Sequence, residues 1–230
     1  MKKTLLALAL AAASCATPQF TNQTALSSAY MLRGQDLSGG KPVVQDTLVA
    51  TSGPVSVIAF GNYNTQSRRT DEADLTLNYD VTVGDRLRLS PNLAYLTFPN
   101  TPLHHRTELA VKATLDETYS LNIVQDLDNK EGFRRGTYVE AGAKKQFDFL
   151  GLHPVADIAA GWENHFLSNQ TGFRHLDGGI GVPFSLLERK VGDKMESIIT
   201  LTPGIRRTFS LNDKAANDQL YGGLTLEIKF

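Results

Sequence analysis

The chain has 230 residues, of which 23 are basic and 24 acidic, so its formal net charge at pH 7 is −1. This balance excludes the basic surface that nucleic-acid binding requires, and we expect no nucleic-acid partner. The single cysteine excludes an internal disulfide framework and a structural zinc site built on several thiolates.

The first 16 residues have the three parts of a secretory signal peptide. Lys2 and Lys3 form a basic start, Thr4–Ala13 is an apolar run, and Ser14-Cys15-Ala16 offers a small-residue cleavage site. The apolar run is too short to cross a bilayer as a helix. We therefore expect residues 1–16 to be removed after export. In an alternative interpretation, Cys15 belongs to a lipidation box and becomes an acylated N-terminus.

Residues 17–230 are expected to form a single domain, because no Pro/Ser-rich linker or low-complexity tract divides them. Removal of Lys2 and Lys3 leaves 21 basic and 24 acidic residues in this domain. The mean hydropathy of the whole chain is -0.20, and no later segment approaches 18 consecutive apolar residues. A transmembrane helix is therefore not expected.

Within this domain, apolar and polar residues alternate with a period of two. From Ala73 to Val83, every odd position is apolar and every even position is Asp, Thr or Asn. Successive strand residues point to opposite faces, so this segment predicts a strand with one apolar and one polar face. The pattern recurs, and turn residues separate its repeats. The predicted strands cover 22–33, 42–51, 54–64, 72–83, 86–98, 104–115, 118–127, 136–147, 154–164, 173–185, 196–208 and 217–230.

This series predicts an all-β fold: a transmembrane, antiparallel, up-and-down β-barrel of about twelve strands, with 10–14 as the range. Bacterial membrane barrels have even strand numbers, which places both chain ends on the periplasmic side. Short connections such as Thr51-Ser52-Gly53 and Asp116-Glu117 are then periplasmic turns, and segments such as Gln35–Gly40 are external loops. Because the external loops are short, we expect none to fold into the lumen.

A soluble barrel would show the same alternation with its apolar face inside. Aromatic residues near the strand ends favour the membrane arrangement, since membrane barrels carry aromatic girdles there. The last predicted strand is amphipathic and ends in an aromatic residue, the form of a signal for the barrel-assembly machinery. The residues that match this signal are Tyr221, Gly223, Leu226, Ile228 and Phe230.

Residues Tyr30 to Gln45 read YMLRGQDLSGGKPVVQ. This segment resembles the opening of the TorF-type porins, in which an aromatic strand ends in Arg-Gly and a Lys-Pro-x-x-Gln return follows a polar loop. The stretches Glu72–Leu75, Leu93-Ala94-Tyr95 and Gly136–Ala141 are also similar, so the likeness covers most of the mature chain. The resemblance implies a small outer-membrane barrel of porin type and implies no catalytic residues.

The leading functional prediction is a narrow passive channel for small polar solutes. Twelve strands lie between eight-stranded barrels, which are filled by side chains, and 16–18-stranded porins, which hold an aqueous channel. Because the expected lumen charges have mixed signs, we predict weak ion selectivity. In an alternative interpretation, the same charges pair across the barrel and plug it. The predicted lumen-lining residues are Asp74, Asp80, Arg86, Arg88, Glu108, Lys112, Glu140, Lys144, Asp157, Glu163, Asp177, Arg206, Glu227 and Lys229.

Arg86 and Arg88 share one parity, and together they could form a cationic rung that binds anionic solutes. The alternative is that they pair with the neighbouring Asp80 or Glu108.

A less favoured alternative is a barrel hydrolase at the cell surface, with a base drawn from His104, His105 or His165. No recognised catalytic signature accompanies these histidines, so no catalytic residue, cofactor or metal is assigned. The expected partners are outer-membrane lipid, lipopolysaccharide, the barrel-assembly machinery and small polar solutes. The oligomeric state is left open.

Overall fold

The structure is a computed structural model that describes residues 17–100, 104–128, 136–166, 171–191, 194–211 and 218–230. These residues form strands, turns and loops without a helix. No helix in the described part of the chain is long and apolar enough to cross a membrane. The predicted signal peptide, residues 1–16, lies outside the described residues.

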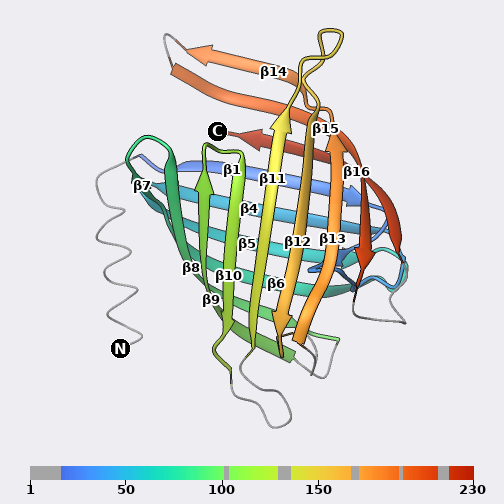
Figure 1. Cartoon of the computed structure of the whole chain (residues 1–230). Helices are drawn as coiled ribbons and strands as arrows, with labels where there is room; N and C mark the ends of the chain where they lie inside the picture. The colour runs from blue at the N-terminus through green and yellow to red at the C-terminus, as the bar shows by residue number, and fades with distance from the viewer. Residues whose placement is uncertain (1–16, 101–103, 129–135, 167–170, 192–193, 212–217) are drawn as a thin grey trace.

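Twelve strands form a closed antiparallel barrel, as the sequence predicts (Figure 1). Each barrel strand pairs with its neighbours along the chain, and β1 pairs with β16 to close the ring. The barrel strands are β1 (Gln19–Ser27), β4 (Val43–Ser52), β5 (Val55–Asn64), β6 (Arg69–Tyr79), β8 (Leu87–Phe98), β9 (His104–Leu115), β10 (Tyr119–Asp126), β11 (Thr137–Gln146), β12 (Val155–Asn164), β13 (Thr171–Gly181), β15 (Lys194–Ser210) and β16 (Gln219–Lys229).

Four further strands supplement the ring. β7 (Val81–Val83) continues the crossing of β6 past Asp80 and pairs with β8. β2 (Met31–Leu32) and β3 (Gln35–Asp36) form a separate two-stranded hairpin. β14 (Phe184–Val191) pairs with the first part of β15.

Closure joins the two ends of the described chain. Seven residues of β1, from Thr21 to Ser27, align with seven of β16, from Lys229 to Gly223. The backbones of Phe20 and Phe230 exchange two hydrogen bonds, of 2.9 and 3.0 Å, and their rings stack at 6.1 Å. Because hydrocarbon holds no water to satisfy a free strand edge, this closure is what permits the sheet to lie in a membrane. We call this end of the barrel the terminal end, and the opposite end, which carries residues 28–42, the loop end.

Large apolar side chains cover the outside of the barrel. Leu75 is 55% exposed, Leu93 42%, Leu109 46% and Ile123 45%, and each lies in the middle of a strand. A water-soluble protein would bury such residues, so this wall is suited to lipid. The polar positions that alternate with them face inward, which is the arrangement expected from the sequence.

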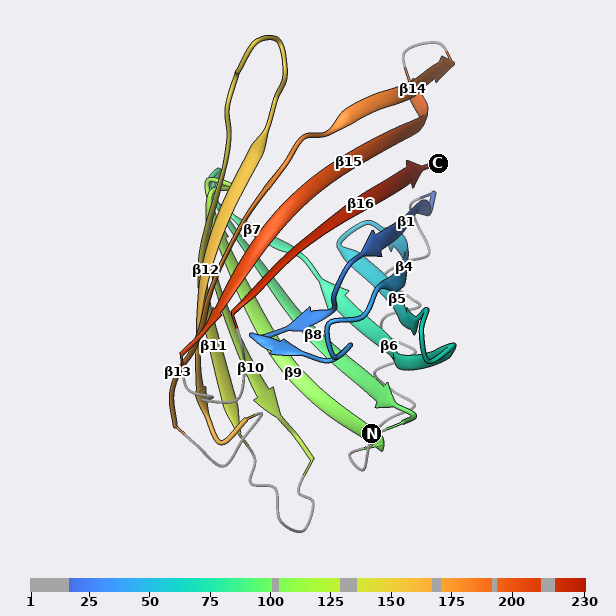
Figure 2. The same ribbon diagram turned by 90° about the vertical axis from the view of Figure 1, so that its right-hand side faces the viewer.

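The first strand is shorter than predicted. β1 ends at Ser27, not at residue 33, and residues 28–42 turn into the barrel, where they carry the β2–β3 hairpin (Figure 2). Arg33 and Gly34 have positive φ angles of 50° and 79°, which an extended strand cannot contain. The expectation that no loop enters the lumen is therefore wrong.

The segment predicted as one strand over 173–185 also differs. β13 ends at Gly181, and the chain resumes as β14 at Phe184 after the Val182-Pro183 step. Pro183 has no N–H to donate to a ladder, which accounts for a break at this position. With β15, β14 forms a hairpin that extends past the terminal end of the barrel (Figure 1).

We predict that Gly136→Ala lowers the free energy of unfolding by about 1–3 kcal/mol, the usual cost of overpacking. A Cβ at Gly136 would lie 2.3 Å from the carbonyl oxygen of His165 and from the Cα of Phe166, so the backbone must shift. Gly61→Ala is the matched control, because its Cβ would meet nothing within 4 Å. Urea unfolding in detergent measures both variants, and equal losses would contradict the packing described here.

Candidate functional site: the barrel interior

Residues 28–42, here called the inner loop, hold their shape through their own polar groups. The backbone N–H of Tyr30 donates to Ser38 Oγ at 3.0 Å, and that of Leu37 donates to the Tyr30 carbonyl at 2.9 Å. Asp36 Oδ1 accepts from the backbone and the hydroxyl of Ser38, at 2.9 and 2.8 Å. The loop is therefore a folded unit with its own hydrogen bonds inside the barrel.

Two side chains anchor the inner loop to the wall. Arg33 donates two parallel hydrogen bonds to the Glu108 carboxylate of β9, at 2.8 and 2.7 Å. The hydroxyl of Tyr30 donates to Glu72 of β6 at 2.6 Å. A bidentate guanidinium–carboxylate pair fixes orientation as well as distance, so Arg33 sets where the loop crosses the lumen.

Both loop side chains keep their ordinary protonation states. Burial alone would lower the pKa of Arg33, but hydrogen bonding and attraction to Glu108 outweigh it, so this pKa is raised. Burial first, and then the neighbouring Glu72 carboxylate, raise the pKa of Tyr30. Arg33 therefore stays a cation and Tyr30 stays a neutral donor at any physiological pH.

Aromatic rings also contact the guanidinium of Arg33. Its guanidinium lies 4.8 Å from the ring centroid of Phe166 and 5.2 Å from that of Tyr138. Arg106 lies 4.0 Å from the same Phe166 ring and forms a 2.8 Å ion pair with Asp126. Cation–π contacts of this kind contribute roughly 0.5–2 kcal/mol each, more when desolvated. Phe166 is 2% exposed, so it lies inside the barrel.

A close contact fixes the tip of the inner loop. A Cβ built on Gly34 would lie 2.5 Å from Cβ of His175 on β13, so only glycine fits there. His175 Nε2 is in turn 2.8 Å from the Tyr138 hydroxyl, which donates to Glu140 at 2.6 Å. The loop thus touches β13 as well as β6 and β9, and it spans the lumen from wall to wall.

Cavities lie on both sides of the inner loop. On the loop-end side, a cavity of about 360 Å³ is lined by Arg33, Phe166 and several acidic residues. A cavity of about 300 Å³ lies beneath Tyr30 and Arg33, between β6 and β10. Two more, of about 490 and 260 Å³, lie toward the terminal end and share Asp157 and Arg206. The inner loop therefore forms a narrow region of the lumen, between the cavity at the loop end and the cavities toward the terminal end.

Most of the predicted lumen residues surround these cavities. Asp74 and Glu108 line the space beneath the inner loop. The cavity toward the terminal end is lined by Arg88, Lys112, Glu140, Lys144, Asp157, Asp177 and Arg206.

The remaining predicted lumen residues have other surroundings. Glu163 is fully buried, 3.6 Å from Arg174. Asp80 accepts a 2.5 Å hydrogen bond from Ser90. Glu227 and Lys229 pair with each other at 3.0 Å.

Arg86 and Arg88 do not form a joint rung. Arg86 is exposed in the turn before β8 and binds Asp116 through two hydrogen bonds, one of 2.5 Å. This pair raises the pKa of Arg86 and lowers that of Asp116. The partner of Arg86 is thus Asp116, and not the expected Asp80 or Glu108.

Charges of both signs line the cavity toward the terminal end. Arg206 binds Asp157 at 3.0 and 2.5 Å and Asp177 at 2.6 Å, so one guanidinium is shared between two carboxylates. Among the described residues, the cavity-lining cations Arg88, Lys112 and Lys144 form no such ion pair. Glu117 and Glu140 line the same cavity, so its lining has four cations and four carboxylates and presents charges of both signs to a passing solute.

Sequence reasoning missed the residues that shape the constriction. Tyr30 and Arg33 were assigned to the first strand, although Arg33-Gly34 followed by Gly39-Gly40 is a turn signal that could have revealed the bend. Tyr138 and His175 have the inward parity of their strands, but nothing in the sequence shows that they meet the loop.

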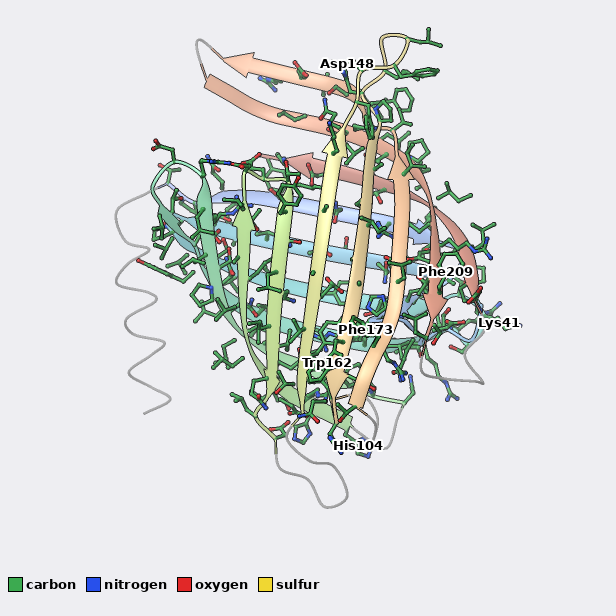
Figure 3. The ribbon with its side chains drawn as sticks, viewed as in Figure 1. Lys41, His104, Asp148, Trp162, Phe173 and Phe209 are labelled. Atoms are coloured by element: carbon green, nitrogen blue, oxygen red, sulfur yellow. The ribbon has the colours of Figure 1, made fainter. Side chains whose placement is uncertain are left out.

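The proposed hydrolase residues are not assembled into a catalytic group. His104 lies at the loop end with a φ of 54°, near the rim (Figure 3). His165 Nδ1 is 2.7 Å from Asn164 Oδ1, a neutral amide that cannot act as the acidic member of a triad. Ser168 and Asn169, polar residues close to His165 in the sequence, lie outside the described residues. No group of three or more His, Cys, Asp or Glu suited to a metal occurs among the residues that are described.

We predict that Arg33→Met frees the inner loop. Glu108 would lose its bidentate partner, and breaking a buried pair from one side costs about 3–5 kcal/mol. Amide hydrogen exchange over residues 29–37 should accelerate at least tenfold, and Glu108→Gln should have a similar effect. If exchange there matches the wild type in both variants, the pair does not hold the loop.

No protein-family model matches the chain, and no curated protein sequence is similar to it. Among solved structures, the fold is similar to "NanC porin structure in rhombohedral crystal form", with TM-score 0.50 and 10% identity over 92% of this chain and 98% of that chain. A chain from "Unveiling the Mechanism Behind the in-meso Crystallization of Membrane Proteins" has TM-score 0.50 and 10% identity over 92% and 84%. At such identity the likeness concerns the fold: this chain has the fold of a small porin barrel.

Proposed function

We propose that this chain is an outer-membrane porin that passes small polar solutes through a constriction built by its inner loop. One observation carries the proposal: cavities lined by charged residues lie above and below a loop that is anchored across the lumen by the Arg33–Glu108 pair. The apolar outer wall and the closed strand ring suit a bilayer, and porins share the fold. The resemblance to the TorF-type porins points to the same class.

Passage through such a barrel depends on size and charge at the inner loop. Arg33 is paired with Glu108 and Tyr30 is a neutral donor to Glu72, so these two loop side chains add no unpaired charge to the narrow region. Selectivity there is mainly steric, which favours small solutes. This arrangement is consistent with a passive channel and requires no cofactor.

The balance of charge differs between the two sides of the constriction. The loop-end cavity is lined by Asp71, Glu72, Glu108, Asp126 and Asp128 against two arginines. The lower cavity is lined by four cations and four carboxylates, among them Arg88, Lys112 and Glu140. A solute therefore meets an acidic entrance and then a cavity of mixed charge, and this mixture favours weak overall ion selectivity.

A plugged barrel is the second candidate, and the inner loop itself favours it. The loop contacts β6, β9 and β13, and its anchors are buried. In that case the chain would be a structural barrel without conductance. The two candidates share every contact described above and differ only in whether ions cross.

Several partners belong to the proposal. Residues 1–16 would direct export, and Tyr221, Gly223, Leu226, Ile228 and Phe230 would be read by the barrel-assembly machinery. In the structure Tyr221 and Gly223 line an inner cavity, and Phe230 lies at the terminal end beside Phe20. Arg68 and Arg69 are exposed near the loop end, where they could contact lipopolysaccharide phosphates.

We predict discrete conductance steps for the refolded protein in planar bilayers. Replacing residues 29–41 by a short Gly-Ser linker should raise the single-channel conductance several-fold, because the constriction is removed. Arg86→Gln is the matched control, since Arg86 is held in an exposed turn, and it should leave conductance unchanged. A silent wild type together with a conducting linker variant would favour the plugged barrel, and silence in both would reject the channel.

We predict that Arg88→Gln combined with Lys112→Gln moves the reversal potential in a salt gradient toward cation preference. The double variant removes two of four positive charges from a cavity that is also lined by four carboxylates, and the neutral replacements are of similar size. Asp116→Asn, in the exposed turn, is the control. An unchanged reversal potential in the double variant would show that these cations do not face the permeation path.

A further inference from the structure

The outer wall carries a charge that a lipid-facing surface does not ordinarily hold. Gln45 of β4 lines an inner cavity, so its neighbour Asp46 points to the opposite face and is exposed. Asp46 Oδ1 accepts hydrogen bonds from Asn22 Nδ2 at 3.0 Å and from the Thr24 hydroxyl at 2.8 Å, both from β1. These donors are neutral, so they hold the carboxylate in place without balancing its charge.

A cation occupies the corresponding position on the other side of the barrel seam. Arg206 of β15 faces inward and binds Asp157, so Arg207 faces outward, where its side chain is 56% exposed. Its guanidinium lies over Phe209 at 4.5 Å and 3.7 Å from Asp218, a half-exposed loop residue. An ion pair as exposed as this one contributes little, so Arg207 remains available to a better partner.

Asp46 and Arg207 are matched in depth. Asp46 is three residues inside Val43, where β4 begins at the loop end, and Arg207 is three residues inside Ser210, where β15 ends there. The strand order β4–β1–β16–β15 places two strands between them, the pair that closes the barrel. One outer wall thus presents an anion and a cation at similar depth on either side of the β1–β16 seam.

We propose that the β1–β16 seam is the interface with a second copy of this chain in the membrane. Barrels inserted in the same orientation can be related by a two-fold axis parallel to the barrel axis. With that axis beside the seam, each Asp46 lies opposite Arg207 of the partner subunit, and the contact occurs twice. Charged side chains on the lipid face are destabilising in a depth-dependent way, and reciprocal pairing removes that cost for both.

The other outward residues of the β1–β16 seam permit a second barrel to approach closely. The outward positions of β1 and β16 between the two charges include Leu26, Gly222 and Leu224. A Cβ on Gly222 would meet no atom closer than 3.5 Å, so this position is a shallow gap in the wall. Apolar contact at the centre, with a charge pair on each flank, has the form of a self-complementary interface.

The experiment measures the oligomeric state of the purified full barrel in lipid nanodiscs or mild detergent, by native mass spectrometry and by cross-linking. Wild type should be dimeric, and Asp46→Asn or Arg207→Gln should raise the dimer dissociation constant at least tenfold. The charge exchange Asp46→Arg with Arg207→Glu should restore dimers, because the pair is re-formed in reverse. Asp85→Asn, an exposed turn carboxylate, is the matched control and should leave the dimer intact.

Heat-modified migration in SDS gels reports whether each variant is a folded barrel. Folded single variants that remain dimeric would overturn the proposal. A folded wild type that is monomeric at all concentrations would also overturn it, whether or not lipopolysaccharide is bound. The test is independent of conductance, so a silent but dimeric barrel would reject the channel and keep the interface.

Discussion

The whole structure depends on the requirement that every backbone donor and acceptor in hydrocarbon has a partner. β1 and β16 meet this requirement by pairing over seven residues, with Phe20 and Phe230 bonded at the end of the ladder. Once the sheet is a ring, one set of alternate side chains must face lipid and the other must share a confined interior. The apolar outer wall and the polar lumen are two results of the same closure.

A confined polar interior then needs partners for its buried polar groups. The wall supplies Glu108 and Glu72, and the inner loop supplies Arg33 and Tyr30 to meet them. Nearer the terminal end, Arg206 forms hydrogen bonds with Asp157 and Asp177. These pairs divide the lumen into a narrow level at the loop and a cavity below it that is lined by charges of both signs. The channel proposal follows from that division, since a loop that were merely packed would not need cavities on both sides.

Much of the fold could be predicted from local pattern. The period of two in segments such as Ala73–Val83 identified the strands, the turn residues gave their number, and twelve strands are present. Inward parity also selected residues such as Asp157 and Arg206, which the structure brings together at 2.5 Å. These features depend on near neighbours in the chain, which is why the sequence alone reveals them.

The constriction could not be predicted in this way, because it depends on contacts between distant segments. Arg33 reaches Glu108 across 75 residues of chain, and Gly34 meets His175 across the lumen. The apolar start of that segment fits a strand locally, and only the left-handed backbone at Arg33 and Gly34 marks it as a turn. The outward position of Asp46 could not be predicted either, because apolar and polar residues do not alternate regularly along β4.

The central claim is that the apolar side chains face lipid and the polar ones line the lumen, and the single tryptophan tests it directly. Trp162 of β12 is the register partner of the exposed Phe173, while the adjacent Glu163 is buried inside (Figure 3). In vesicles, its fluorescence should be quenched strongly by brominated acyl chains and little by aqueous iodide. Strong iodide quenching without bromolipid quenching would place this face in water and contradict the account.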